Sequence, residues 1–120
     1  MNKKTVVLGA SPNPSRYSYL AVNRLQAHGH AVIPIGKKKG AINNSPILNE
    51  TVNAENVDTV TLYLNAQNQK QYYEYILSLH PKRIIFNPGA ENNELAQLAA
   101  QNNIQPMEAC TLVLLGTHQY

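Results

Sequence analysis

The sequence predicts a single doubly wound α/β domain, on three observations. Short apolar runs, such as Val6 to Leu8 and Arg83 to Phe86, recur along the chain and are separated by segments with helical periodicity. These runs are continuous rather than alternating, which is typical of parallel strands covered by helices on both faces. The length of 120 residues suits one domain with one core. We therefore expect a five-stranded parallel sheet in the order 3-2-1-4-5, with helices on both faces.

The first predicted strand, Thr5 to Leu8, ends at a glycine turn. Gly9 permits a tight turn, and a following helix would direct free N–H groups and a partial positive charge at a phosphate. The stretch departs from the glycine-rich dinucleotide motif, because Ser11 and Pro14 stand where that motif has glycines. Ser11 would offer a hydroxyl and Arg16 a planar cation. Valine at position 9 should obstruct a pyrophosphate and leave the fold largely intact; the alternative is an ordinary loop with a solvated arginine.

An amphipathic helix is predicted next, and a second buried strand follows it. Tyr17, Ala21 and Leu25 recur on one side of this helix, and Gly29 suits its end. Ala31 to Ile35 is short, apolar and β-branched, so the whole unit has βαβ length and a right-handed crossover is expected.

A run of lysines, Lys37 to Lys39, stands between Gly36 and Gly40 after the second strand. In NAD-binding units a carboxylate follows this strand and accepts a hydrogen bond from the ribose 2′-hydroxyl. Ammonium groups in its place favour a ligand with an extra phosphate on its ribose, such as NADP or coenzyme A. The alternative is a solvated turn that is basic for solubility.

The remaining elements are expected to alternate in the same way. In order they are a loop-rich segment 41–56 with a brief strand at Pro46 to Leu48, a third strand at Val57 to Leu64, a helix over 66–79, a fourth strand at Arg83 to Phe86, a helix capped by Asn92 or Asn93, a strand at Gln105 to Glu108, and an apolar tail. The fourth strand ends in a second glycine turn, Asn87 to Gly89. In the expected Rossmann-like order the first and fourth strands are neighbours, so both glycine turns would line one crevice.

Composition argues against several kinds of partner. Ten Lys and Arg against seven Asp and Glu give a net charge of +3, but no aromatic-rich platform accompanies the cations, so we expect no nucleic-acid partner. The apolar stretches are too short for a membrane span or a signal peptide, so we expect a cytoplasmic protein without a membrane partner. The single cysteine, Cys110, forms no internal disulfide, and the histidine spacing does not indicate a metal site.

Several stretches together resemble a known family, the small stand-alone CoA-binding domain proteins, related to the CoA-binding domain of succinyl-CoA synthetase α subunits. The stretches are VVLGASPNPSRYSYLAVNRL, HAVIPIGKK, VDTVTLYL, FNPGAENNEL and EACTLVLL, which span nearly the whole chain. The resemblance implies that coenzyme A or an acyl-CoA is held by Gly9, Ala10, Ser11, Pro12, Arg16, Pro34, Gly36, Lys37, Lys38, Asn87, Pro88 and Gly89. The Asn-Pro that usually follows the Pro-Val of the second strand in the family is replaced here by Ile35-Gly36-Lys37.

The residues favour a binding protein over an enzyme, because no Ser-His-Asp order or paired acids with catalytic spacing stand out. Cys110 could lie within reach of a bound thiol, although a cysteine is more often a small buried hydrophobe. Two other functions stay open: an NADP(H)-binding enzyme or redox sensor, and a protein-interaction domain with a vestigial nucleotide site. For the last, Tyr72, Tyr73 and Tyr75 are the candidates for an exposed patch and a homodimer contact.

Overall fold

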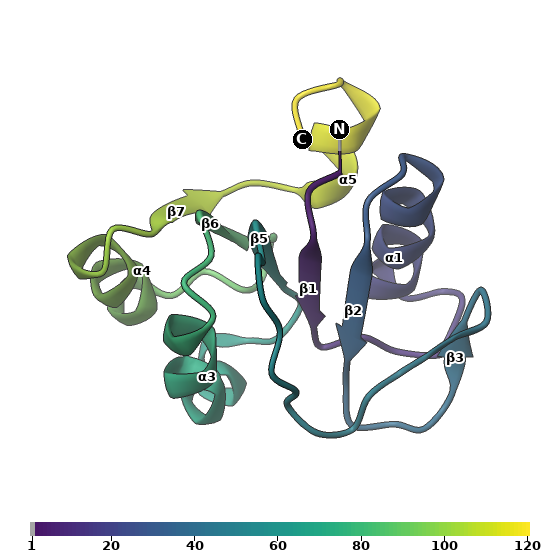
Figure 1. The fold of residues 1–120 in the computed structure, drawn as a ribbon, viewed down its shortest axis with the longest axis horizontal. Helices are drawn as coiled ribbons and strands as arrows, with labels where there is room; N and C mark the ends of the chain where they lie inside the picture. Colours follow the sequence, from purple (N-terminus) through teal and green to yellow (C-terminus); the bar gives the residue numbers. More distant parts are fainter. Residues whose placement is uncertain (1) are drawn as a thin grey trace.

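The computed structural model describes residues 2–120 as a parallel sheet with helices on both faces (Figure 1). Within these residues the main sheet has five strands: β1 (Thr5–Leu8), β2 (Val32–Ile35), β5 (Thr59–Leu62), β6 (Arg83–Phe86) and β7 (Gln105–Glu108). A small antiparallel hairpin is formed by β3 (Ala41–Ile42) and β4 (Ser45–Pro46). The helices are α1 (Tyr17–Ala27), α2 (Ala66–Gln69), the 3₁₀ turn η1 (Lys70–Tyr72), α3 (Tyr73–Ser78), α4 (Asn93–Gln101) and α5 (Thr111–Gly116).

The strands of the main sheet lie in the order β2-β1-β5-β6-β7. Beyond β2, Leu48 forms an isolated parallel bridge with Ile35. When that brief segment is counted as the third strand, the order begins 3-2-1-4-5, which is the predicted order, although the prediction took Val57 to Leu64 as the third strand. The neighbours differ from the prediction in one respect, because β5 lies between β1 and β6 and pairs with both. The crevice beside β1 is therefore bounded by the end of β5 and not directly by the second glycine turn.

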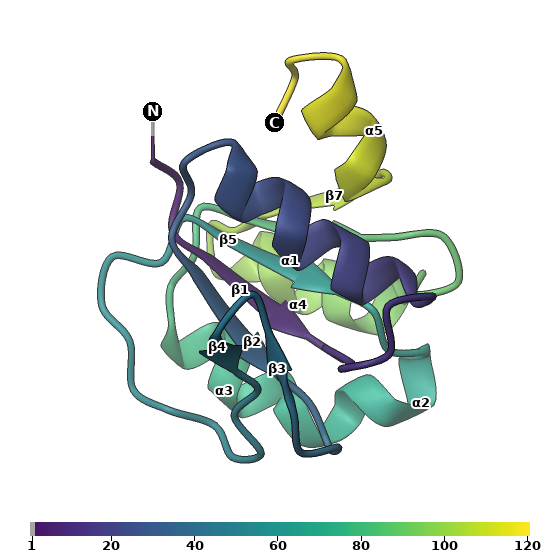
Figure 2. The ribbon, with the colours of Figure 1, turned by 90° about the vertical axis from the view of Figure 1, so that its right-hand side faces the viewer.

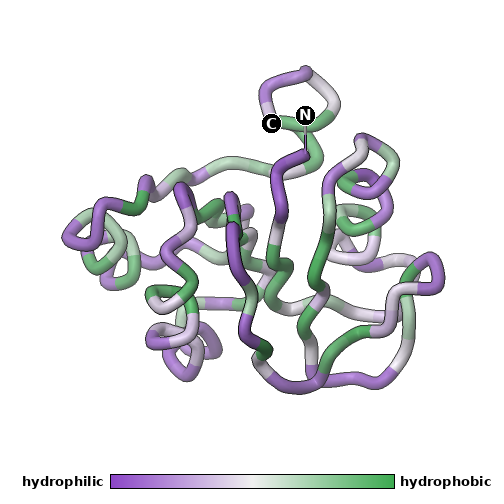
Figure 3. The backbone as a smooth tube through the Cα atoms, viewed as in Figure 1, coloured by the Kyte–Doolittle hydropathy of each residue, from purple (hydrophilic) through white to green (hydrophobic). Residues whose placement is uncertain are grey.

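Each face of the sheet carries its own apolar core. Val6 and Leu8 of β1 belong to the core under α3 and α4, whereas Val7 belongs to the core under α1 and α5. The side chains of Val6, Val7 and Leu8 are all fully buried, as the continuous apolar pattern predicted. Figure 2 shows α1 in front of the sheet and α4 behind it, with α5 above α1. Figure 3 shows the hydrophobic residues concentrated along the central strands and the hydrophilic residues in the loops.

The helices follow the sequence pattern with three exceptions. Helix α1 ends before Gly29, which has a φ of +84°, and Asn92 caps α4 by accepting from the N–H of Leu95 at 3.2 Å, both as predicted. The helix expected over 66–79 is instead interrupted by η1. Tyr17, expected on the buried side of α1, is 72% exposed. The apolar tail forms the short helix α5, which the sequence analysis did not identify.

The tyrosine cluster expected as an exposed patch is held within the molecule. Tyr72, Tyr73 and Tyr75 are partly buried and pack against the core on the α3 side of the sheet. The Tyr75 hydroxyl donates to the carbonyl of Val52 at 2.8 Å, and the Tyr73 hydroxyl donates to Glu94 at 2.9 Å. This cluster therefore does not provide the interaction surface that the sequence suggested.

No helix in the part of the chain that the structure describes is both long enough and apolar enough to cross a membrane.

Candidate functional site

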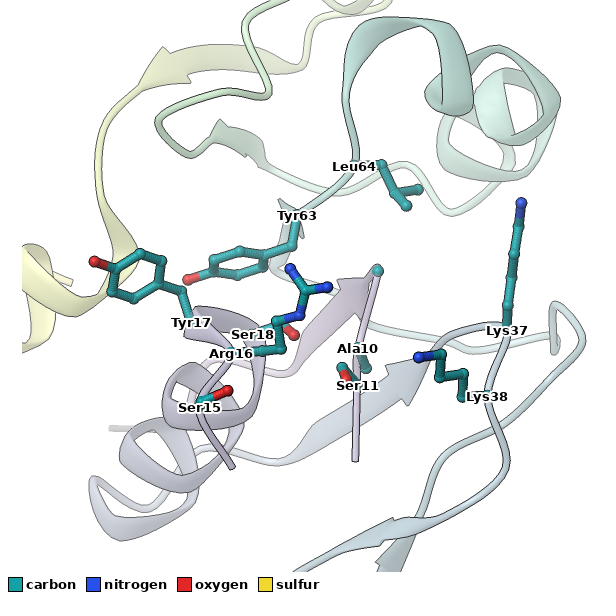
Figure 4. Close-up of a pocket in the computed structure, with 11 residues that line it drawn as sticks. Ala10, Ser11, Ser15, Arg16, Tyr17, Ser18, Lys37, Lys38, Tyr63 and Leu64 are labelled. Carbon is teal, nitrogen blue, oxygen red and sulfur yellow. The ribbon is translucent and has the colours of Figure 1, made fainter. Parts of the chain in front are cut away.

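Loops that follow neighbouring strands surround a cavity of about 570 Å³ at the carboxyl edge of the sheet, here named the first cavity (Figure 4). Its walls come from the turns after β1, β2 and β5 and from the start of α1. The lining residues are Gly9, Ala10, Ser11, Ser15, Arg16, Tyr17, Ser18, Lys37, Lys38, Tyr63 and Leu64. The carboxyl edge of a doubly wound sheet, where the strand order reverses, is the usual position of a ligand site in this type of fold.

Gly9 lines this cavity, and two features of the structure favour glycine at this position. Its φ is +92°, a conformation that glycine adopts more readily than other residues, and a Cβ there would lie 2.6 Å from the carbonyl oxygen of Tyr63. The N–H groups of Gly9 and Ala10 both donate to the carbonyl of Ile35 at 2.9 Å. The expectation that valine at position 9 would leave the fold largely intact is therefore wrong, because its side chain would collide with the backbone after β5.

Glycines also bring the lysine turn against the glycine turn. A Cβ at Gly36 would overlap the carbonyl oxygen of Ala10. At the other end of the lysine turn, a Cβ at Gly40 would lie 2.5 Å from the Cβ of Pro12. These two close approaches fix the position of the lysine backbone relative to the first turn.

The loop between β1 and α1 is ordered by its own side chains. The N–H of Asn13 donates to the Ser11 hydroxyl at 3.1 Å, and the side-chain Oδ1 of Asn13 accepts from the N–H and hydroxyl of Ser15 at 3.0 and 2.8 Å. Arg16 occupies the N-cap position of α1 and makes no side-chain bond to the first turn within the described chain. The N–H groups of that turn are therefore available to a ligand, and their partial positive charge favours an anion.

Exposed cations surround the first cavity without neutralising partners. Arg16, Lys37 and Lys38 line it, and their side chains are drawn around it in Figure 4. Among residues 2–120 there is one ion pair, between Lys82 and Asp58 at 3.9 Å. In this part of the chain, no carboxylate therefore pairs with the cations that line the cavity. Together with the start of α1, these cations make the first cavity electropositive.

Hydrogen bonds from the side chain of Asn49 hold the lysine turn in place. The amide of Asn49 donates to the carbonyls of Gly36 at 2.9 Å and Lys38 at 3.2 Å. Lys39, the last lysine of the run, does not line the cavity.

A smaller cavity of about 280 Å³, here named the second cavity, adjoins the first at Tyr17 and Tyr63. It lies over the ends of β5, β6 and β7. Its lining residues are Tyr17, Tyr63, Asn87, Pro88, Cys110 and Leu112, and among these described residues there is no Lys, Arg, Asp or Glu.

The second cavity rests on a buried polar network centred on Asn87. The Asn87 amide donates to the Thr61 hydroxyl at 2.6 Å and to the Leu62 carbonyl at 2.9 Å, and its carbonyl oxygen accepts from the N–H of Thr111 at 2.9 Å. The hydroxyls of Thr61 and Thr111 are hydrogen-bonded to each other at 2.7 Å. This side chain therefore joins the ends of β5 and β6 to the start of α5, and its amide hydrogens are already used.

Tyr63 separates the two cavities and carries an unsatisfied hydroxyl. Among the described residues, its oxygen is buried and has no hydrogen-bond partner. Burial raises the pKa of Tyr63 well above its usual value, so the group stays protonated and is a potential donor. Figure 4 shows the exposed ring of Tyr17 beside the Tyr63 hydroxyl.

The structure brings together part of the residue set implied by the sequence. Gly9, Ala10, Ser11, Arg16, Lys37 and Lys38 line the first cavity, and Asn87 and Pro88 line the second. In the described chain, Pro12, Pro34, Gly36 and Gly89 line neither cavity. Pro12 and Gly36 act instead in packing one turn against the other, Pro34 is paired with Val7 inside the sheet, and the N–H of Gly89 donates to Glu91.

The lining residues that the sequence did not indicate are Ser15, Tyr17, Ser18, Tyr63, Leu64 and Leu112. Tyr63 and Leu64 directly follow β5, so a correct placement of that strand beside β1 would have identified both. No comparable signal marked Leu112, because the helix that carries it was not predicted.

Taken together, the fold and these cavities define a doubly wound domain with a ligand-sized site at the carboxyl edge of its sheet. Residues 3–116 match the CoA binding domain family, and the chain belongs to that family.

Solved structures similar to this chain agree with that fold. An uncharacterized protein known from a crystal structure is 53% identical, with a TM-score of 0.97 over 100% of this chain and 99% of that one. A hypothetical protein from Pyrococcus horikoshii OT3 is 21% identical, with a TM-score of 0.83 over 92% and 80%. The dinucleotide-forming acetyl-coenzyme A synthetase 1 of Ca. Korarchaeum cryptofilum, in complex with phosphate and ADP, is 16% identical, with a TM-score of 0.71 over 89% of this chain and 26% of that one. The last two show the fold alone, and no curated protein matches the chain.

Proposed function

We propose that this chain binds coenzyme A or an acyl-CoA and catalyses no reaction on it. In this proposal the phosphorylated adenosine diphosphate part occupies the first cavity, and the pantetheine arm passes between Tyr17 and Tyr63 into the second. Family membership supports the ligand class.

The observation that carries the proposal is the set of unpaired cations around the first cavity. Arg16, Lys37 and Lys38 face one space together with the free N–H groups at the start of α1. Coenzyme A carries a pyrophosphate and a separate ribose phosphate. A planar guanidinium beside the helix start suits the pyrophosphate, and the lysine ammonium groups suit the ribose phosphate.

The absence of catalysis is supported by the lining residues. Within residues 2–120, neither cavity is lined by an Asp, Glu or His, the side chains that most often transfer protons in enzymes. Cys110 contributes a thiol to the lining of the second cavity, and it is partly exposed.

Calorimetric titration with CoA, dephospho-CoA, NADP and NAD tests the ligand. A charge-assisted hydrogen bond contributes roughly 1.5–3 kcal/mol before solvent screening reduces it, so we expect CoA to bind at least about tenfold tighter than dephospho-CoA at low salt. Equal binding of these two ligands, or tighter binding of NADP than of CoA, contradicts the proposal.

A matched set of lysine variants locates the phosphate site. Changing Lys37 and Lys38 to Ser should remove most of the preference for CoA over dephospho-CoA, because both side chains line the first cavity. Lys39→Ser removes a charge from the same turn but not from the cavity lining, so it should retain that preference. A similar loss in both variants would mean that the lysines act only through the general field of the turn.

A further inference from the structure

We propose that the second cavity holds the acyl group of a short, uncharged acyl-CoA, with the thioester carbonyl accepting a hydrogen bond from the Tyr63 hydroxyl. This inference rests on the proposed function and adds the class of acyl group to it. It predicts that the protein prefers an acyl-CoA to free CoA and discriminates against acyl chains that end in a carboxylate.

The walls of the second cavity suit an apolar chain. Leu112, Pro88 and the ring of Tyr63 provide apolar surface. The amide hydrogens of Asn87 are already donated to Thr61 and to the Leu62 carbonyl, so this polar side chain offers a ligand no free donor. A carboxylate placed here would lose its water and meet no cation among the described lining residues, which is strongly unfavourable.

Among the buried side-chain polar atoms of residues 2–120, the Tyr63 hydroxyl oxygen is the one without a hydrogen-bond partner of normal geometry. This oxygen makes no hydrogen bond of normal geometry among the described residues, although the Thr111 hydroxyl lies close enough to lower the pKa of Tyr63 somewhat against the larger effect of burial. A buried donor without an acceptor is unfavourable, and a ligand carbonyl that displaces the exposed Tyr17 ring beside it would remove that cost. A thioester supplies such a carbonyl at the end of the pantetheine arm, whereas the free thiol of CoA is only a weak acceptor.

The size of the second cavity limits the acyl chain. Its volume is about 280 Å³, half that of the first cavity at about 570 Å³. Pockets for drug-sized ligands measure roughly 300–1,000 Å³, so a cavity below this range that also admits the end of the pantetheine arm leaves space for a short chain only.

Butyryl-CoA and succinyl-CoA test the charge discrimination, because their acyl chains have the same number of carbons and differ in the terminal carboxylate. We expect butyryl-CoA to bind at least about tenfold tighter than succinyl-CoA in calorimetric titrations. Failure of CoA itself to bind would remove the proposed function. Binding of CoA with equal affinities for butyryl-CoA and succinyl-CoA overturns this inference alone.

Two neighbouring positions of α5 provide a matched pair for that test. Leu112→Lys places a cation in the cavity wall and should narrow or reverse the preference for butyryl-CoA. Val113 is 59% exposed and lies outside the lining, so Val113→Lys adds the same charge to the same helix and should retain the preference. Equal ratios in the two variants would show that Leu112 does not face the acyl chain, against the inference.

Tyr63→Phe tests the hydrogen bond to the thioester. We expect wild-type protein to bind butyryl-CoA about two- to tenfold tighter than CoA through this bond and the buried chain, and the variant to lose most of that preference. Tyr72→Phe makes the same change in a half-buried tyrosine outside both cavities and should keep it. Thermal melting of both variants confirms folding, and a full preference in folded Tyr63→Phe rules out the proposed contact.

Discussion

The two cavities lie at one edge of the sheet but are built in different ways. The first is shaped by backbone segments that approach each other closely at Gly9 and Gly36, and its charges are carried by exposed side chains such as Lys37. The second is shaped by a buried side-chain network around Asn87, and its described lining residues carry no charge. The first cavity is therefore suited to recognising charge on a fixed frame, and the second to recognising shape and polarity.

Gly9 provides the largest expected effect and a direct test of the backbone frame. Gly9→Ala should lower the free energy of unfolding by about 3 kcal/mol, from the cost of positive φ plus that of overpacking against the Tyr63 carbonyl. Gly89 has nearly the same φ, +93° against +92°, but an added Cβ there meets nothing within 4 Å. Gly89→Ala should therefore cost only about 1–2 kcal/mol.

Urea unfolding of both glycine variants gives the comparison. Equal losses would mean that only the backbone conformation matters at Gly9, and that the close approach of Tyr63 relaxes without cost.

Asn87→Ala tests the network under the second cavity. The substitution leaves the Leu62 carbonyl and the N–H of Thr111 without their partners, so we expect a loss of about 2–3 kcal/mol in the free energy of unfolding. Asn93→Ala, at an exposed position, should change it by less than about 0.5 kcal/mol. A similarly small effect at Asn87 would contradict the structural role assigned to its side chain.

Local patterns in the sequence predicted the first cavity better than the second. The glycine turn after β1 and the lysine turn after β2 each depend on a few adjacent residues, and both lie where the pattern placed them. The position of β5 depends instead on which strands pair, and the bridge between Leu48 and Ile35 that completes the order involves one residue pair. The sequence indicated a brief strand at Pro46 to Leu48, but a signal this short does not show which strand it pairs with.

Two further differences have the same physical origin. Tyr17 continues the apolar stripe of α1, but it is the first residue of that helix and extends past the sheet edge, so it lines the cavities instead of the core. Residues 111–115 have no polar alternation that would indicate an amphipathic helix, and the N–H of Thr111 is held by Asn87, far away in the sequence. Periodicity describes which side of an element is apolar, but not where the element ends relative to its neighbours.

The smallest effect that we expect is a difference between the two cavities in how binding depends on salt. Raising the ionic strength from about 0.01 M to about 0.15 M shortens the screening length from about 30 Å to about 8 Å, which weakens attraction between exposed charges. Affinity for CoA should therefore fall several-fold, because Arg16, Lys37 and Lys38 are exposed. The ratio of butyryl-CoA to CoA affinity should stay constant, since the described lining of the second cavity is uncharged and the added butyryl group is neutral. Titrations of both ligands at the two salt concentrations measure these quantities. A ratio that changes with salt would show that the acyl group lies near the lysines of the first cavity. The assignment of the phosphates to the first cavity and of the acyl group to the second would then be wrong.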